Sequence, residues 1–205
     1  LIGAIERSKL IYTLNRDADA NLTISSPLEA NRPTAIVQCI VGVDVGYENP
    51  VFASLETDYA DADADPTGEA LARTEKRLTY YELDLGLNHV VRRWTEPVDR
   101  SAHHLISVPG GYNYSTEAWD GPSGVLVCID DYIVYRHPDQ PPHIVPIPVR
   151  ENASIHRGSM IVASVLHKMK TSFFLLVQNE DGDLFKVTVE HDEEQVKAVR
   201  IKYFD

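Results

Sequence analysis

One strand-like run recurs four times along the chain, and this repetition limits the possible folds more than any other feature. Each copy opens with a polar residue and continues with β-branched and aromatic residues, which suit a pleated, half-buried strand. The copies begin at Lys9, Arg77, Asp131 and Asp183. Four short strands repeating roughly every 40 to 50 residues are typical of propeller blades. The repeat therefore predicts an all-β fold, a partial β-propeller with WD40-like blades of four-stranded antiparallel sheets.

The strand pattern predicts about three and a half blades, because the first residues contain runs for only two strands, Lys9–Leu14 and Leu22–Ser25. One full blade carries an acidic insertion at 58–75, and the next carries a loop insertion at 110–124. The expected divisions are residues 1–30 for the last two strands of a blade, and 31–99, 100–150 and 151–205 for one full blade each.

Turn residues separate the expected strands of the full blades. Asp181-Gly182 is a strong hairpin signal because glycine tolerates a positive φ. Pro146 and Pro148 cannot donate to a strand ladder, so they predict an outermost strand. The expected strands are Ala35–Val43, Val51–Thr57, Arg77–Asp84 and His89–Trp94, then Leu105–Val108, Gly124–Ile129, Tyr132–Arg136 and Ile144–Ile147, then Met160–Leu166, Phe173–Gln178, Asp183–Glu190 and Val196–Tyr203.

An incomplete circle of blades has a physical consequence. A propeller closes so that only short, protected strand edges remain. Three and a half blades would leave apolar blade faces in water, which favours aggregation. The chain also opens at Leu1 without a methionine. We therefore expect an excerpt of a longer polypeptide that expresses poorly or aggregates on its own.

The charge balance argues against nucleic acid as a direct partner. The chain has 19 basic and 31 acidic residues, a net charge of −12. Binding to nucleic acid draws most of its affinity from basic contacts to phosphate, and the densest basic cluster here is the pair Arg92-Arg93. No apolar run reaches the ~20 residues that span a membrane. The sequence thus predicts little direct nucleic-acid binding and no membrane partner.

The acidic insertion contains the most site-like motif of the chain. Asp61, Asp63 and Asp65 alternate as in the start of a calcium-binding loop. Pro66 then stands where such a loop needs glycine, and Ala72 stands where it needs a bidentate glutamate. No helical pattern is evident on either side. The expected structure is a flexible, solvated loop without metal.

Other reactive residues give no pattern of a catalytic, cofactor or metal site. His103 and His104 are adjacent on an expected strand, so their side chains point to opposite faces and cannot share one ion. No nucleophile elbow, phosphate-binding glycine loop or nucleotide fingerprint is present. Cys39 and Cys128 lie inside apolar runs, which predicts two buried, reduced thiols. The sequence therefore predicts a protein that is not an enzyme and holds no cofactor.

Three aromatic residues are the candidates for protein contact. Tyr112, Tyr114 and Trp119 lie in the long connection at 110–124. Exposed tyrosine and tryptophan dominate interface hot spots. The same rings could instead fold back onto the sheet that carries the loop. The sequence leaves both interpretations open.

Several strings in this chain resemble the splicing factor 3b subunit 3 family. The matching strings are GVDVGYENPVFASLE, DPTGEA, LTYYELDLGLNHVVR, SVPGG, DGPSGVLVC and GDLFKVTVE, with LNRD at Leu14–Asp17 and LTISSPLEA at Leu22–Ala30. The resemblance runs in order from about Gly3 to Asp205. It implies a fungal-type piece of the first of three seven-bladed propellers. One departure is the string YNYSTEAW, inserted between Gly111 and Asp120.

The resemblance also implies a function. Members of this family are non-catalytic scaffolds of the U2 small nuclear ribonucleoprotein in the nucleus. The implied partners are the HEAT-repeat subunit and a small companion subunit of splicing factor 3b, other U2 proteins, and a histone acetyltransferase co-activator complex. The implied role is support of branch-site recognition in pre-mRNA splicing. Two alternatives remain: a paralogous triple propeller of the DNA-damage-binding or cleavage and polyadenylation type, and a nucleic-acid- or calcium-binding module.

Overall fold

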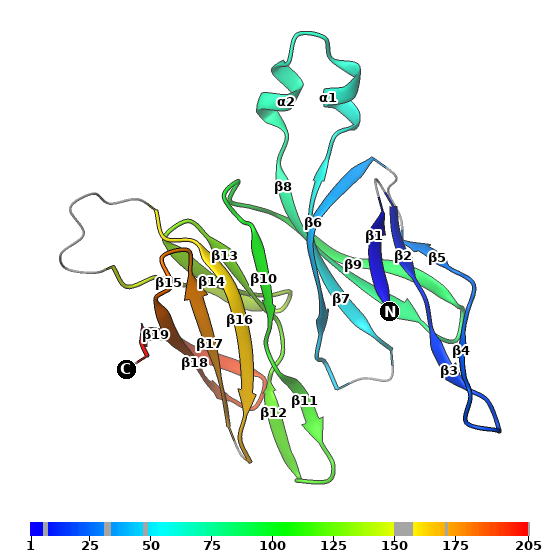
Figure 1. Cartoon of the computed structure of the whole chain (residues 1–205), viewed down its shortest axis with the longest axis vertical. Helices are drawn as coiled ribbons and strands as arrows, with labels where there is room; N and C mark the ends of the chain where they lie inside the picture. Colours follow the sequence, from blue (N-terminus) through cyan, green and yellow to red (C-terminus); the bar gives the residue numbers. More distant parts are fainter. Residues whose placement is uncertain (6–7, 31–33, 47–48, 150–157, 171, 205) are drawn as a thin grey trace. The chain divides into compact units, whose positions relative to one another are not determined.

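Antiparallel strands make up most of the structure (Figure 1). The computed structural model describes residues 1–5, 8–30, 34–46, 49–149, 158–170 and 172–204 of the 205-residue chain. These residues form two compact units. Unit 1 contains Leu1–Ile40 and Asn49–Val98, and unit 2 contains Val41–Glu48 and Asp99–Asp205. The predicted all-β class is confirmed.

Three four-stranded sheets contain all the strands expected for the full blades. The first has the order β6 (Ala35–Val43), β7 (Val51–Asp58), β8 (Lys76–Asp84), β9 (His89–Val98). The second has the order β10 (His104–Ser107), β13 (Val125–Ile129), β14 (Tyr132–His137), β15 (Gln140–Pro146). The third has the order β16 (Ile161–Lys168), β17 (Phe173–Asn179), β18 (Leu184–Asp192), β19 (Gln195–Tyr203). The boundaries of the blades, at 30/31, 99/100 and 150/151, stay a prediction.

Local sequence signals explain this sheet order. Gly182 has φ +87° in the turn before β18, as the Asp-Gly signal requires. Pro146 ends β15, which lies at an edge of its sheet. Proline is tolerated there because an edge strand leaves one side of its backbone unpaired.

The first thirty residues contain more strands than the two predicted runs, Lys9–Leu14 and Leu22–Ser25. Five short strands are present: β1 (Ile2–Ile5), β2 (Ser8–Ile11), β3 (Leu14–Arg16), β4 (Leu22–Ile24) and β5 (Leu28–Ala30). They form a sheet of order β1-β2-β5 and a separate β3-β4 hairpin. The expected run Lys9–Leu14 is divided because Thr13 leaves the sheet and donates its N–H to Ser25 Oγ, 3.0 Å away. Strands of three or four residues are too short to show alternation.

Unit 1 has an apolar core at the meeting of these strands with the first four-stranded sheet. Phe52 and Tyr81 stack there with ring centroids 5.2 Å apart. The other buried members are Ile11, Ala30, Leu83 and Val90. Strands β1, β2 and β5 are thus held by packing, since their own length could not stabilise them.

A buried ion pair joins β2 to the same sheet. Lys9 is fully buried, and its Nζ lies 2.9 Å from Glu56 Oε2. Glu56 also accepts a hydrogen bond of 2.9 Å from the Tyr81 hydroxyl and one of 3.2 Å from Ser54 Oγ. Burying two charges is costly unless they are paired and otherwise hydrogen-bonded. The network satisfies that condition and fixes β2 against β7 and β8.

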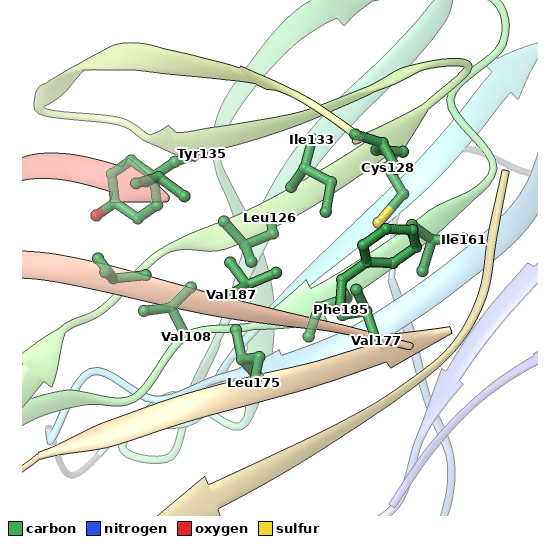
Figure 2. Close-up of a cluster of buried hydrophobic side chains, with 14 of the residues drawn as sticks. Val108, Leu126, Cys128, Ile133, Tyr135, Ile161, Leu175, Val177, Phe185 and Val187 are labelled. Carbon is green, nitrogen blue, oxygen red and sulfur yellow. The ribbon is translucent and has the colours of Figure 1, made fainter. Parts of the chain in front are cut away.

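The core of unit 2 lies between its two four-stranded sheets. Side chains of β13 and β14 meet side chains of β17 and β18, as Figure 2 shows. The central ones are Leu126, Cys128, Ile133, Tyr135, Leu175, Val177, Phe185 and Val187. Tyr135 is the one phenol among them, and its hydroxyl donates to Ser123 O at 3.0 Å. Burial raises the pKa of Tyr135 above its ordinary value.

The acidic insertion contains two short helices, so the expectation of a helix-free loop is wrong. They are α1 (Ala60–Ala64) and α2 (Glu69–Arg73), and neither has a buried residue. The predicted exposure to solvent is thus confirmed. Alanine is the strongest helix former, which accounts for α1. Glu69 and Arg73 add an ion pair of 3.1 Å at i,i+4 spacing in α2.

Candidate protein-interaction site

The connection at 110–124 folds as a β-hairpin instead of a loop. Its strands are β11 (Gly110–Asn113) and β12 (Ala118–Pro122), and we call residues 110–122 the aromatic arm. Figure 1 shows the arm extending beyond the end of β10. No alternation of apolar and polar residues predicts this hairpin, because its strands are short and contain glycines.

The aromatic arm brings the three predicted aromatic residues together. Tyr112 and Trp119 are cross-strand partners with ring centroids 5.7 Å apart, and Tyr114 lies 5.1 Å from Tyr112. Both ring pairs meet edge to face, with interplanar angles of 75° and 78°. This arrangement is favoured by the ring quadrupoles. The rings therefore form a continuous cluster on one hairpin.

The cluster is exposed to solvent. Tyr114 is 85% exposed and Tyr112 is 38% exposed, whereas Trp119 is half-buried. None of the three belongs to the buried core of unit 2. The rings pack on one another, and their outward surfaces remain open. Such residues at the tip of a hairpin could serve as interface anchors.

Glycines fix the root of the aromatic arm to the backbone nearby. Gly111 has φ +88°, and a Cβ there would lie 2.4 Å from Gly46 Cα. A Cβ on Gly110 would lie 2.1 Å from Asp44 O, and one on Gly121 would lie 2.2 Å from Pro109 O. No side chain can be accommodated at such distances. The arm is therefore anchored by close backbone packing.

Acidic groups surround this root. Lys168 Nζ lies 3.5 Å from Asp44 Oδ2 and 4.0 Å from Asp120 Oδ2. Asp120 also accepts a hydrogen bond of 3.3 Å from the Asn113 amide. Glu117 in the turn is exposed, and residues 110–124 contain no lysine, arginine or histidine. The arm thus carries a net negative charge.

The comparison with protein families identifies the fold. The family model described as RSE1/DDB1/CPSF1 first beta-propeller matches residues 1–205. The chain belongs to this family. Its four-stranded antiparallel sheets are those of a β-propeller, so the predicted partial propeller is confirmed.

Individual members of the family are similar to this chain over its full length. Pre-mRNA-splicing factor RSE1 from Mycosarcoma maydis is 65% identical over 209 residues, covering 100% of this chain and 17% of that protein. Splicing factor 3B subunit 3 from Danio rerio is 56% identical over 208 residues, covering 100% and 16%. Spliceosome-associated protein 130 A from Arabidopsis thaliana is 50% identical over 205 residues, with the same coverage. The chain therefore spans about one sixth of these relatives, and its resemblance to splicing factor 3b subunit 3 is confirmed.

In this member of the propeller family the two adjacent histidines contact different groups. His103 places Nδ1 2.9 Å from Ser101 O and Nε2 3.0 Å from Ile161 O. His104 Nε2 lies 3.4 Å from Ser164 Oγ. Burial, together with the nearby His103, lowers the pKa of His104. The rings act in local packing and do not converge on one point.

Asp65 of the acidic insertion also has a structural role. Asp65 Oδ2 accepts a hydrogen bond of 2.7 Å from Ala70 N, and its Oδ1 accepts bonds from Thr67. The bond from Ala70 N, followed by those from Thr67, lowers the pKa of Asp65. Within the described ranges, no three histidine, cysteine, aspartate or glutamate side chains gather as metal ligands.

The two cysteines are free thiols, but they differ in burial. Cys128 is buried in the core of unit 2, whereas Cys39 of β6 is half-buried. The prediction of two buried thiols is therefore wrong for Cys39, because much of β6 is only partly covered.

One cleft was not anticipated from the sequence. It lies in unit 1 beside the acidic insertion, has a volume of about 620 Å³, and is lined in part by Arg73, Arg77 and Arg92. Arg77 pairs with Glu75 at 3.0 Å, and Arg73 pairs with Glu69. Three separate elements supply these arginines, so no sequence motif predicts that they lie together.

Among the described helices, none is long and apolar enough to cross a membrane.

Proposed function

We propose that this chain is part of a non-catalytic protein-interaction scaffold of the splicing factor 3b complex. The observation that carries the proposal is 65% identity, over the whole chain, to a protein named a pre-mRNA-splicing factor. The scaffold would act in the nucleus and support recognition of the intron branch site by the U2 small nuclear ribonucleoprotein.

The proposed partners are proteins. They are the HEAT-repeat subunit and the small companion subunit of splicing factor 3b, and other proteins of the U2 particle. A histone acetyltransferase co-activator complex is a further candidate. The net charge of −12 supports protein partners with basic faces over direct contact with RNA.

The aromatic arm is proposed as one protein-contact site, with Tyr112, Tyr114 and Trp119 as its anchors. Two tyrosines and a tryptophan bury a large area with few rotatable bonds, which limits the entropy lost on binding.

The division of the chain at residues 30/31, 99/100 and 150/151 into successive blades is part of the same proposal. The blades would present the arm on a rigid support.

A paralogous scaffold is the second candidate function. The matching family takes its description from RSE1, DDB1 and CPSF1 together, so membership alone leaves DNA-damage-binding and cleavage and polyadenylation scaffolds open. The splicing-factor relatives at 50–65% identity favour the first candidate.

Affinity purification tests the proposal. The full-length protein that contains this chain is tagged and purified from nuclear extract, and its partners are quantified by mass spectrometry. We expect the HEAT-repeat subunit and other branch-site factors in near-stoichiometric amounts. Recovery of ubiquitin-ligase or polyadenylation components in their place would overturn the assignment.

A further inference from the structure

We propose that the aromatic arm binds an arginine-bearing, extended segment of a partner protein. The inference names the chemistry of one partner and rests on the proposed scaffold function only in taking that partner to be a protein. Two properties of the arm carry it, the open faces of its rings and the negative charge around them.

The ring cluster offers surfaces that attract cations. Aromatic faces carry the negative part of the ring quadrupole, and a guanidinium group both stacks on them and interacts with that charge. In the part of the chain that the structure describes, the recorded cation–π contacts are Lys9 with Tyr81 and Lys186 with Phe174. Neither of these described contacts involves the aromatic arm, and Tyr114 is 85% exposed, so a cation from outside can reach its ring.

The charge of the arm favours the same ligand. Asp44 and Asp120 share Lys168 at 3.5 and 4.0 Å, so one ammonium group faces two carboxylates there. Glu117 adds an exposed carboxylate in the turn. Glu117 and Asp120 flank Trp119 in the sequence of the arm, and their negative charge would attract a basic segment.

The close packing of the arm reduces the conformational entropy that it would lose on binding. The close packing of Gly111 against Gly46 holds the root, and edge-to-face contacts hold the rings. A preorganised site loses little freedom when it binds. The partner segment would supply most of the ordering.

RNA is disfavoured at this surface although bases also stack on aromatic rings. Sites for single-stranded nucleic acid combine stacking rings with a positively charged groove. Residues 110–124 contain no basic residue, and the nearby Lys168 already faces two carboxylates. A phosphate backbone would therefore meet repulsion where an arginine would meet attraction.

The test measures peptide binding by the full-length protein. Fluorescence anisotropy is recorded with a labelled Gly-Ser-Arg repeat peptide, a Gly-Ser-Gln repeat peptide of equal length, and oligouridine. We expect the arginine peptide to bind more tightly than the other two. Trp119→Ala and Tyr114→Ala should each weaken its binding by about fivefold. Glu117→Gln should weaken it at low salt and have little effect at high salt.

Matched controls keep the test decisive. Tyr132→Ala removes another exposed tyrosine, on β14 outside the arm, and should leave binding unchanged. Equal binding of the arginine and glutamine peptides, or binding that is indifferent to loss of the rings, would overturn the inference. The inference would also be overturned if oligouridine bound more tightly than the arginine peptide and lost that binding when the rings were removed. The same variants are also tested by affinity purification. If they still recover splicing factors, the proposed scaffold function stands even where the inference about arginine binding fails.

Discussion

At the scale of single residues, the ion pair of Lys9 and Glu56 is costly to bury. The Lys9 ammonium has no access to water, and the carboxylate that faces it is also held by Tyr81 and Ser54. A buried pair of this kind adds little net stability, but loss of one partner leaves an uncompensated charge.

We therefore expect Glu56→Ala to lower the free energy of unfolding by about 3–5 kcal/mol. Urea unfolding of the complete propeller measures the loss. The paired substitution Lys9→Met with Glu56→Leu is the control, because it removes both charges and keeps similar volumes. If the single variant were as stable as the double variant, the pair would not be buried as described.

A second residue-scale prediction concerns acid stability. Arg93 Nε donates to Glu82 Oε2 at 2.6 Å, and Asn49 donates to Glu82 Oε1 at 3.0 Å. The Arg93 bond is the main cause that lowers the pKa of Glu82 below its ordinary 4.5. The folded state therefore gains stability above pH 4.5 and loses it as the pH falls through the lowered pKa.

The measurement is the thermal midpoint of the complete propeller as a function of pH. Arg93→Gln should reduce the midpoint above pH 4.5 and flatten its fall at lower pH, because the pKa of Glu82 then approaches its ordinary value. Lys197→Gln, which removes an exposed lysine of β19, is a control for general loss of charge. Parallel pH curves for wild type and Arg93→Gln would contradict the prediction.

At the scale of elements, the aromatic arm depends on backbone approach at its root. Gly111→Ala should lower stability by about 1–3 kcal/mol from its positive φ alone, with more from overlap with Gly46. Gly42→Ala is the matched control, because a Cβ there meets nothing within 4 Å. Thermal unfolding checks both variants. Equal midpoints would contradict the close packing.

Sequence reasoning succeeded for elements whose pattern is long and failed where tertiary context decides. β18 alternates apolar and polar residues over most of its length, and β17 opens with a run of five apolar residues, so both patterns identify a strand. The strands β3 and β5 have three residues each and leave no period to detect. The three aromatic residues were predictable as candidates from their type. Their assembly into one cluster was not, because it depends on the cross-strand register of Tyr112 and Trp119.

At the scale of the whole molecule, the chain leaves apolar strand surface in water. Val162 and Val165 of β16 are 52% and 58% exposed, and β16 lies at an edge of its sheet. Leu14, Leu22 and Ile24 of the β3-β4 hairpin are also exposed. Exposed apolar edge strands favour association with other chains.

The 205-residue chain expressed alone should therefore aggregate, whereas the complete propeller should remain monodisperse. Sedimentation velocity of the two proteins at equal concentration provides the comparison. Val162→Lys with Val165→Lys should reduce aggregation of the isolated chain by adding charge to β16. A monodisperse wild-type chain with a sharp melting transition would count against the partial propeller.

The scaffold function is tested most directly by depletion and add-back in a splicing extract. Extract depleted of the full-length protein is supplemented with wild type, or with a version that lacks the blades formed by this chain, and association of the U2 particle with the branch site is measured. We predict that wild type restores association, whereas the shortened protein does not and fails to recover the HEAT-repeat subunit. Full restoration by the shortened protein would contradict the account.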